Sequence, residues 1–587
     1  MKTILDLIVE ELKPAFTGCG YDEKYIRVTV SNRPDLCEYQ CNGAMAAAKA
    51  YKKKPIDIAN EVVEKTAGSK MFSEINAVMP GFINIRLNPC YLASYVQQVA
   101  EDEKLGLNAA KKPETIIIDY GGANVAKPLH VGHLRSAVIG ESIKRISRYM
   151  GHHVISDVHL GDWGLQMGLI IEELHDRQPD LVYFDPDYTG EYPSEPPFTI
   201  SELEDIYPAA SAKSKVDAAF RERAQQATFK LQSGYAPFHA IWKHIMNVSL
   251  KDLKKNYGNL NVSFDLWKGE SDAQPYIPGL IEDLQKKGLA YESDGALVVD
   301  IAQEGDAKEY PPCIVRKSDG AALYATSDLA TIIEREQDFH PDRYIYVVDK
   351  RQELHFIQVF RVAKKAGIVK EDTPMIFLGF GTMNGKDGGP FKTREGGRLE
   401  HLIKNIDEKV YEKIQEKQKV PADEMTRTAE IVGLAALKYA DLSNQATKDY
   451  IFDVDRFISF EGNTGPHIQY MIVRIKSILE KYKELRGADA KVVPIRPAES
   501  ETEKALQMAL CRFGEVTESA FYETAPHKLC QYMAAVADAF NAFYLENKIL
   551  SEEDAAKQAA FISLITLTKR VLDTCMDLLG MESPEHM

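Results

Sequence analysis

The chain has 587 residues, 45% hydrophobic and 27% charged, and a formal net charge of −16. One hydrophobic core sustains only about 250–300 residues, so three or four domains are expected, and no apolar run approaches the ~18–20 residues of a membrane span. The acidic balance alone would argue against a nucleic-acid partner, but binding depends on where the positive groups lie and not on their sum.

Residues 1–110 predict a small α+β domain. The opening MKTILDLIVEELK carries acidic residues within its apolar stretch, which is typical of an amphipathic helix and not of a signal peptide. A strand is expected at 25–31, an alanine-rich helix at 44–50 and a second strand at 82–87. The polar stretch 111–114 then indicates a domain boundary.

Residues 111–400 predict a doubly wound α/β domain of the Rossmann-like type, because short β-branched runs bounded by Gly, Pro or Asp are typical of buried parallel strands. A connective insertion of mainly helical pattern interrupts the domain at about 170–312. The four expected strands are 115–121, 152–158, 342–349 and 374–381.

Residues 401–587 predict an all-α helical bundle without strands. Amphipathic patterns occur around 431–442, 468–479, 530–543 and 561–579, with a polar break at 487–500. The eight cysteines are scattered without a Cys-x-x-Cys pair, so neither a zinc site nor a disulfide framework is expected, and no metal ligand is assigned. That pattern indicates a reducing cytoplasm.

The most informative segment is TIIIDYGGANVAKPLHVGHLRSAVIGES, in which a strand, a small-residue loop and a helix follow one another. His130 and His133 are i,i+3 neighbours on the first helical turn, where anions bind favourably. Gly132 permits close approach of a nucleotide, and two imidazoles can donate hydrogen bonds to the phosphates of ATP. Two histidines near a helix start are often structural, but the preceding strand and Lys127 favour the functional interpretation.

This segment closely resembles the ATP-binding motif region of the arginyl-tRNA synthetases, a class I family. The resemblance continues in the same order through most of the chain. Further similar segments are HLGDWGLQMG (159–168), YATSD (324–328), KRQELHFIQ (350–358), FKTREGG (391–397), LKYADLS (437–443), FEGNTGPHIQY (460–470) and LLGMESPEHM (578–587). The resemblance implies ATP-dependent activation of L-arginine and its transfer to the 3′ end of tRNA(Arg), with Mg²⁺ accompanying ATP and no tightly bound cofactor. A monomer is the usual state of the family.

The second class I motif, a Lys-Met-Ser-Lys-Ser loop, is degenerate here. The matching place reads GKDGGPFKTR (385–394), without the second lysine. By resemblance, Lys127 belongs with the phosphate-binding groups, as do Lys386, Lys392 and Arg394 of this loop. Positive groups on either side of the nucleotide can stabilise the pyrophosphate leaving group. The alternative for Lys392 and Arg394 is a solvated surface loop.

Arginine specificity requires acceptors for a planar, permanently charged guanidinium. Tyr324 and Asp328 are i,i+4 on one helix and can face one site. By resemblance, Asp328 accepts the guanidinium and Tyr324 and Gln352 line the site, while Asn124 and His130 lie near the α-amino and carboxylate groups. A helix cap or surface salt bridge is the alternative for Asp328, and Glu270 is a weaker candidate for a second acidic contact.

Two surfaces are implied for tRNA. The helical bundle resembles the family's anticodon-binding domain. Tyr470, Arg474 and Lys476 lie on or near its first helix. In the N-terminal domain, Phe82 and Asn84 match positions that contact the outer corner of the tRNA, by stacking and base-edge hydrogen bonds. Structural packing is the alternative for Tyr470 and Phe82.

Other interpretations remain open at this point. Another class I synthetase, of the cysteinyl or glutamyl type, is disfavoured by the lack of a zinc-ligand pattern and by the motifs LHVGHLRS and LKYADLS. A catalytically inactive, tRNA-binding relative is disfavoured because His130, Gly132, His133, Lys127 and Asp328 are all present.

Overall fold

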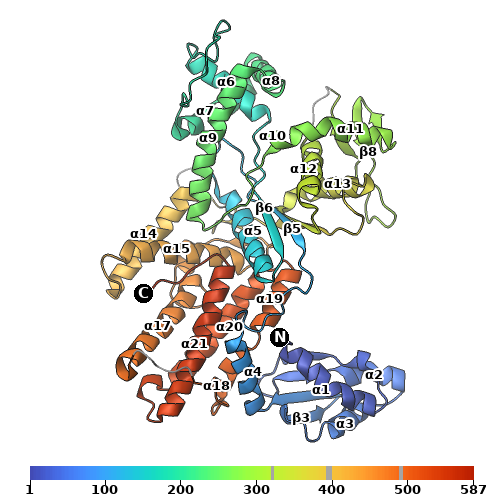
Figure 1. Cartoon of the computed structure of the whole chain (residues 1–587), viewed down its shortest axis with the longest axis vertical. Helices are drawn as coiled ribbons and strands as arrows, with labels where there is room; N and C mark the ends of the chain where they lie inside the picture. The colour runs from blue at the N-terminus through green and yellow to red at the C-terminus, as the bar shows by residue number, and fades with distance from the viewer. Residues whose placement is uncertain (319–322, 390, 392–398, 488–492) are drawn as a thin grey trace.

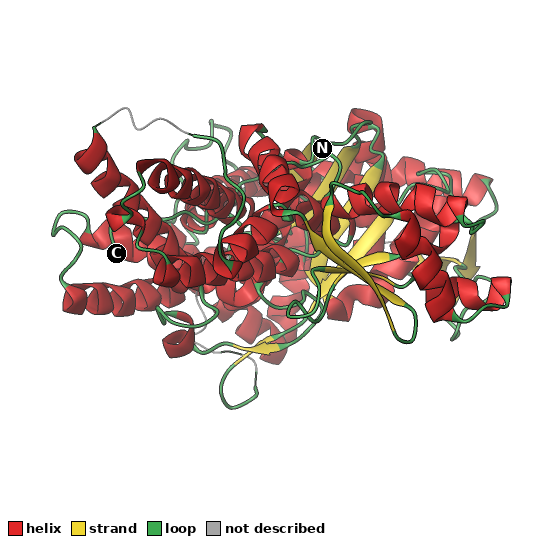
Figure 2. Cartoon of the chain, turned by 90° about the horizontal axis from the view of Figure 1, so that it is seen from below, coloured by secondary structure: helices red, strands yellow, loops and turns green. Residues whose placement is uncertain are grey.

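The structure of the chain is a computed structural model that describes residues 1–318, 323–389, 391, 399–487 and 493–587. The N-terminal domain and the C-terminal helices lie at one end of the long axis, the helices α6–α9 lie at the other, and the strands β5 and β6 lie between them (Figure 1). Figure 2 shows that the part of the view around the C-terminus is helical and that the strands gather on the other side. Among the described helices none combines the length and the apolar character needed to cross a membrane.

The N-terminal domain is a four-stranded antiparallel sheet of order β1-β2-β4-β3 covered by helices. Alternation along β4 buries Ile83, Ile85 and Leu87 and turns Phe82 and Asn84 to the other face. The strands β2 and β3 were not predicted, because each shows too little apolar alternation. Its elements are α1 (Ile4–Gly18), η1 (Glu23–Tyr25), β1 (Val28–Val30), β2 (Tyr39–Cys41), α2 (Gly43–Tyr51), α3 (Pro55–Lys65), β3 (Phe72–Val78), β4 (Phe82–Leu87) and α4 (Pro89–Glu101).

The central domain is built on a four-stranded parallel sheet of order β11-β10-β5-β6, which confirms the predicted α/β fold and all four predicted strands. The chain moves outward in one direction from β5 to β6 and in the other from β10 to β11, so the switch point lies between β5 and β10. Its elements are β5 (Thr115–Tyr120), α5 (Val131–Tyr149), β6 (His153–Asp157), β10 (Arg343–Asp349), η3 (Lys350–Gln352), α13 (Glu353–Lys365), β11 (Met375–Phe380) and β12 (Met383–Asn384).

The insertion between β6 and β10 has two lobes, which Figure 1 shows apart from each other. The expectation of a mainly helical insertion was incomplete, because the second lobe contains a three-stranded antiparallel sheet, β7-β8-β9. Its short strands alternate too little to be told from loops by pattern. The first lobe comprises α6 (Leu165–Arg177), α7 (Ile200–Val216), α8 (Ala218–Gln232) and α9 (Ala236–Asn259). The second comprises α10 (Glu270–Ala273), η2 (Gln274–Tyr276), α11 (Ile277–Lys286), β7 (Ala290–Ser293), β8 (Ala296–Val299), β9 (Cys313–Arg316) and α12 (Tyr324–Phe339).

The C-terminal region is the predicted helical bundle, with one correction. Residues beyond His401 were expected to contain no strand, yet β13 pairs in parallel with β12 after the central sheet. Two residues give no periodic signal, and only the partner strand identifies them. The elements are α14 (Leu399–Lys417), α15 (Met425–Leu442), β13 (Tyr450–Ile451), α16 (Val454–Phe457), α17 (Gly465–Arg486), α18 (Glu501–Leu510), α19 (Phe513–Tyr522), α20 (His527–Glu546), η4 (Ile549–Ser551) and α21 (Ala555–Leu578).

A buried ion pair ties the helical bundle to the central domain. Arg135 of α5 donates its Nε to Asp441 Oδ2 of α15 at 2.9 Å, and both side chains are almost completely buried. The same guanidinium donates to the carbonyl of Gly381, directly after β11, and to that of Lys448. The largest hydrophobic cluster also runs from α1 through α5 to α21, so the central helix is held from both sides.

Candidate active site

The expected site residues gather at the carboxyl ends of the parallel strands, where a doubly wound sheet binds its ligands. Asn124 and His130 follow β5, and Gln352 follows β10. The loop segment of Asn124 bridges to Gly161 in the segment after β6. Three strand ends therefore supply one region of the molecule.

The first half of the site, here called the ATP side, comprises Lys127, His130, Gly132 and His133. His130 is the N-cap of α5: its Nδ1 accepts a hydrogen bond from the Gly132 amide at 2.9 Å, and its own amide donates to His133 Nδ1 at 3.2 Å. The two rings lie with centroids 4.0 Å apart. A side chain at Gly132 would meet the His130 ring at 2.6 Å, so glycine is required there for the ring to fold over the helix end.

Both imidazoles are neutral at pH 7. Burial lowers the pKa of His130, and the charge of Lys127 lowers it further. Burial is also the main cause that lowers the pKa of His133, to about 3, with smaller contributions from His130 and Lys127. Because each Nδ1 accepts a backbone hydrogen bond, the single ring proton of each histidine resides on Nε2. The pair therefore presents two neutral N–H donors at a helix N-terminus, a suitable arrangement for phosphate oxygens.

The loop that carries Lys127 is braced by the first lobe of the insertion. Ala126 adopts the left-handed region, with φ of 61°, and its amide donates to Ser249 Oγ of α9 at 3.0 Å. The ammonium of Lys127 lies over the ring of Tyr207 from α7, with Nζ 4.6 Å from the ring centroid. The insertion thus determines where the lysine beside the histidine pair lies.

The second half of the site, here called the arginine side, comprises His159, Glu270, Asp328 and His355. The Asp328 side chain is 19% exposed, and its Oδ2 lies 2.5 Å from Nε2 of His355 on the first turn of α13. Its other oxygen, Oδ1, lies 3.8 Å from Nε2 of His159. Burial lowers the pKa of His159, but neighbouring carboxylates, Asp119 first, outweigh burial and raise it above its ordinary value.

Glu270 begins α10, which packs against α12. The Glu270 amide donates to the Leu160 carbonyl at 3.0 Å, and this places the carboxyl beside His159. Burial raises the pKa of Glu270 to about 7; His159 opposes the shift, and the charges of Asp162 and Asp328 add to it. A cation entering this site would find one half-buried carboxylate and a second carboxyl ready to ionise.

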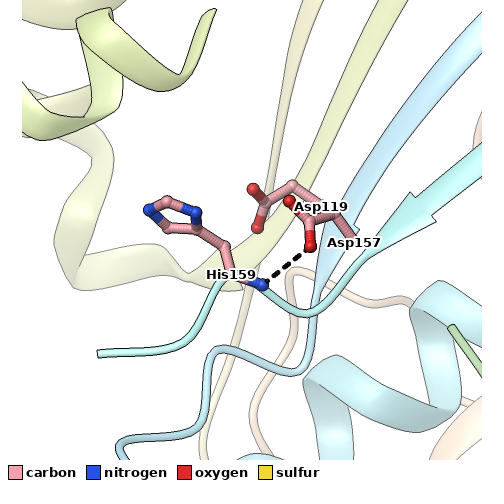
Figure 3. Close-up of side chains that lie close together, drawn as sticks. All are labelled: Asp119, Asp157 and His159. Atoms are coloured by element: carbon pink, nitrogen blue, oxygen red, sulfur yellow. Dashed lines mark hydrogen bonds between the residues drawn. The ribbon is translucent and has the colours of Figure 1, made fainter. Parts of the chain in front are cut away.

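Asp119, Asp157 and His159, drawn in Figure 3, offer ligand atoms within 4.8 Å of one another and could in principle hold a metal ion. Arg335 of α12 already occupies this position, since its Nη2 donates to Asp119 at 2.6 Å and to Asp157 at 2.7 Å. The chemistry is that of a buried ion pair, which ties the helix of Asp328 to the ends of β5 and β6.

Not all residues expected on the arginine side are equally enclosed. Tyr324 lies one turn before Asp328 but is 73% exposed. Gln352 is exposed at the N-cap of α13. His159 and His355 were missed, although both lie in segments that carried the family resemblance. Their only sequence signal was the residue type, because contact with Asp328 joins residues far apart in the chain.

In the loop after β12, Lys386 lies 3.0 Å from Asp453 and is exposed. The structure therefore places this lysine in a surface ion pair. Lys392 and Arg394 lie outside the described residues.

Tyr470 and Arg474 lie together on α17 and line a cavity of about 700 Å³ between α17, α20, η4 and the C-terminus. The Arg474 guanidinium lies over the rings of Tyr470 and Tyr544, at 4.9 and 5.0 Å from their centroids, and donates to Asn541 at 2.7 Å. Lys476 donates to Glu585, which also lines this cavity, at 2.7 Å. Aromatic rings beside a fixed cation suit stacked bases.

On the N-terminal sheet, Phe82 and Asn84 share the face of β4 that points away from Ile83 and Ile85. Asn84 accepts a hydrogen bond from Gln40 at 2.9 Å across the sheet. Phe82 is half-buried on this face and does not point to the side of the sheet where Ile83 and Ile85 are buried.

Three family models match the chain, each to a different region. Residues 2–87 match the arginyl tRNA synthetase N-terminal domain, 95–454 the class I (R) tRNA synthetase catalytic domain and 468–587 the DALR anticodon-binding domain. Together they span almost the whole chain.

Similar proteins and structures agree with these matches. The chain is 58% identical to an arginine–tRNA ligase of Agathobacter rectalis and 57% identical to one of Alkaliphilus oremlandii, with 100% of each chain covered. Its fold matches the crystal structure of the arginyl-tRNA synthetase of Plasmodium falciparum with a TM-score of 0.80 at 23% identity, covering 100% of this chain and 99% of that one. The Thermus thermophilus arginyl-tRNA synthetase matches with a TM-score of 0.78 at 21% identity, with 100% of both covered.

Proposed function

The chain belongs to the arginyl-tRNA synthetase family, and we propose that its ATP side and its arginine side together form the place where arginine is activated. The enzyme uses ATP to form arginyl-adenylate and transfers the arginyl group to tRNA. The observation that carries the proposed site is that a neutral histidine pair, which follows β5, and a half-buried aspartate, held by a histidine that follows β10, both lie at the carboxyl edge of one sheet.

In the first step, a carboxylate oxygen of arginine attacks the α-phosphorus of MgATP, and the bond to the bridging oxygen of pyrophosphate breaks. The proposed role of His130 and His133 is to donate their Nε2 protons to phosphate oxygens, where negative charge develops. Lys127 is proposed to act on the same phosphates, and Lys386, Lys392 and Arg394 on the leaving group. Mg²⁺ is proposed to accompany ATP as part of the substrate.

Asp328 is proposed to accept the guanidinium, with Glu270 as the second acidic contact. The half-buried carboxylate next to His355 and the carboxyl with a pKa of about 7 support this assignment. Tyr324 and Gln352 are proposed to close the site from its exposed rim. Asn124 and His130 are proposed to bind the α-amino and carboxylate groups.

In the second step, a terminal ribose hydroxyl of tRNA attacks the carbonyl carbon of the adenylate, and AMP leaves. We propose that tRNA(Arg) docks through the cavity of Tyr470 and Arg474 and through Phe82 and Asn84. We also propose that the chain divides into three domains, residues 1–110, 111–400 and 401–587. These contacts then belong to the first and the third domain. A cytoplasmic monomer is also proposed, because one chain carries both docking surfaces and all eight cysteines are free.

A pyrophosphate exchange assay with each amino acid, with and without tRNA(Arg), tests this proposal. We expect arginine to be the one amino acid that supports exchange. We expect this exchange only when tRNA is present, since arginyl enzymes usually require their tRNA for activation. Robust exchange without tRNA would contradict the predicted order of events. Exchange with another amino acid and not with arginine would contradict the proposed specificity.

A further inference from the structure

His355 makes the shortest described contact to the proposed guanidinium acceptor. Its Nε2 lies 2.5 Å from Asp328 Oδ2, and the His355 side chain is 27% exposed. An ionised carboxylate has no proton to give, so the imidazole must be the donor in this hydrogen bond. A hydrogen bond to a charged acceptor is stronger than one between neutral groups.

His355 is itself firmly held. It lies on the first turn of α13, and its ring packs edge-on against Phe356 with centroids 5.0 Å apart. Phe356 is buried and packs in turn against Tyr346 of β10 and Phe377 of β11. Packing against the central sheet therefore fixes the position of the ring that contacts the carboxylate on α12.

The orientation of this carboxylate matters because a guanidinium binds it best in one plane. Two parallel N–H···O bonds require both oxygens to face the ligand within a narrow range of angles. A carboxylate without a second partner rotates about its terminal torsion, which has broad minima. A fixed donor to Oδ2 occupies one lone pair of that oxygen and leaves the other free for the guanidinium. It also stops the rotation of the carboxylate.

We propose that His355 is a positioning residue for arginine selection: its Nε2–H holds the Asp328 carboxylate in the plane that a guanidinium requires. This inference rests on the proposed role of Asp328. It assigns His355 no contact with the reacting atoms. Its contribution is to the affinity for arginine and to the rejection of neutral analogues, and not to the binding of ATP.

Two substitutions and a matched control test the inference. His355→Leu removes the donor and puts an apolar side chain in its place, whereas His355→Gln retains an amide N–H at a similar reach. His153→Gln is the control, because His153 is an exposed histidine at the opposite, amino end of β6. The full-length enzyme is assayed with tRNA(Arg), and KM for arginine, KM for ATP, kcat and discrimination against citrulline are measured for each variant.

We expect His355→Leu to raise KM for arginine about tenfold, as loss of one charge-assisted hydrogen bond does, while KM for ATP changes less than twofold. Discrimination against citrulline should fall by a similar factor. His355→Gln should stay within about threefold of the parent, and His153→Gln should match it. Unchanged arginine kinetics in a folded His355→Leu enzyme would overturn the inference, as would an equal loss for arginine and ATP.

The Asp328→Asn variant separates this inference from the proposed function. If Asp328→Asn loses arginine affinity and His355→Leu does not, His355 is not a positioning residue and Asp328 remains the acceptor. If Asp328→Asn leaves arginine kinetics intact, the proposed acceptor is wrong and the inference falls with it. In the double variant, His355→Leu should add little to the loss caused by Asp328→Asn, because both act on one interaction.

Discussion

The ATP side and the arginine side lie at the same edge of one sheet but treat charge in opposite ways. On the ATP side, His130 and His133 are neutral and receive their orientation from backbone amides at the start of α5. On the arginine side, Asp328 and Glu270 are carboxyl groups with histidines beside them. One side offers neutral donors and the other offers acceptors.

The ligands explain this difference. A triphosphate arrives with its own counterion, so the proposed site combines neutral N–H donors at a helix N-terminus with the ammonium of Lys127. A guanidinium cannot lose its proton and arrives without a counterion, so the protein must supply the negative charge and keep it in place before binding. The comparison predicts the largest effect where the negative acceptor is removed, and smaller effects where a phosphate donor or a packing contact is removed.

Removal of the acceptor should produce the largest effect. Deleting one partner of a buried ion pair costs about 3–5 kcal/mol, so Asp328→Asn should lower kcat/KM for arginine by roughly two to three orders of magnitude. KM for ATP should barely change. The rejection of citrulline should relax, because the carboxylate that repels the citrulline carbonyl is replaced by an amide. Steady-state kinetics with both substrates measure this. Intact arginine kinetics in a folded variant would point to Glu270 as the acceptor.

Removal of a donor on the ATP side should have the second-largest effect. His133→Ala and Lys127→Ala should each slow adenylate formation by about a hundredfold, as loss of one preorganised donor in the transition state does. Single-turnover measurement of adenylate formation, with thermal unfolding as the folding control, tests both. An unchanged rate in both variants would remove these residues from the ATP side.

The pH dependence of arginine binding should be smaller. Glu270, the proposed second acidic contact, can pair with arginine only when it is ionised, and its pKa of about 7 in the free enzyme means that it holds a proton below this pH. The affinity for arginine should therefore fall as pH drops through 7, by up to about tenfold per pH unit, and should level off above it. Neighbouring carboxylates raise the pKa of His159, and its protonation acts in the same direction because it adds positive charge beside the carboxyl groups.

Measurement of arginine KM from pH 6 to 9 in the parent and in Glu270→Gln tests this prediction. The variant should bind arginine more weakly at pH 8 and should lose most of the slope below pH 7. Further titratable groups close to this part of the site are Asp162, Asp328, His355, Tyr324 and the Asp119–Arg335–Asp157 ion-pair cluster. A slope that persists in Glu270→Gln would assign it to one of these or to His159.

The contact between Lys127 and Tyr207 should have the smallest effect. A cation–π contact at a partly exposed site contributes about 0.5–1 kcal/mol, so Tyr207→Leu should weaken ATP use by about two- to fivefold. Tyr207→Phe keeps the aromatic face and should match the parent. The readout is KM for ATP at saturating arginine. An equal loss in both variants would show that the hydroxyl matters and not the ring.

Prediction from the sequence succeeded where the signal is local. The four parallel strands have continuous apolar runs, and the histidine pair occupies one helical turn, so both could be recognised from neighbouring residues. It failed for β2, β3, β7–β9, β12 and β13, which alternate too little or are too short to be recognised without a partner strand. It also missed His159 and His355, because contact with Asp328 joins three separate elements.

The family, the α/β fold of the central domain, and the residue types available to bind phosphate and guanidinium could all be derived from the order of the amino acids. Which of these residues lie together, and in what state of protonation, follows from the folded arrangement. Hydrophobic periodicity and helical spacing act over a few residues and are written in order along the chain. The pKa of Glu270, the tautomers of His130 and His133, and the orientation of Asp328 depend on burial and on charges brought from distant segments, which exist only once the chain has folded.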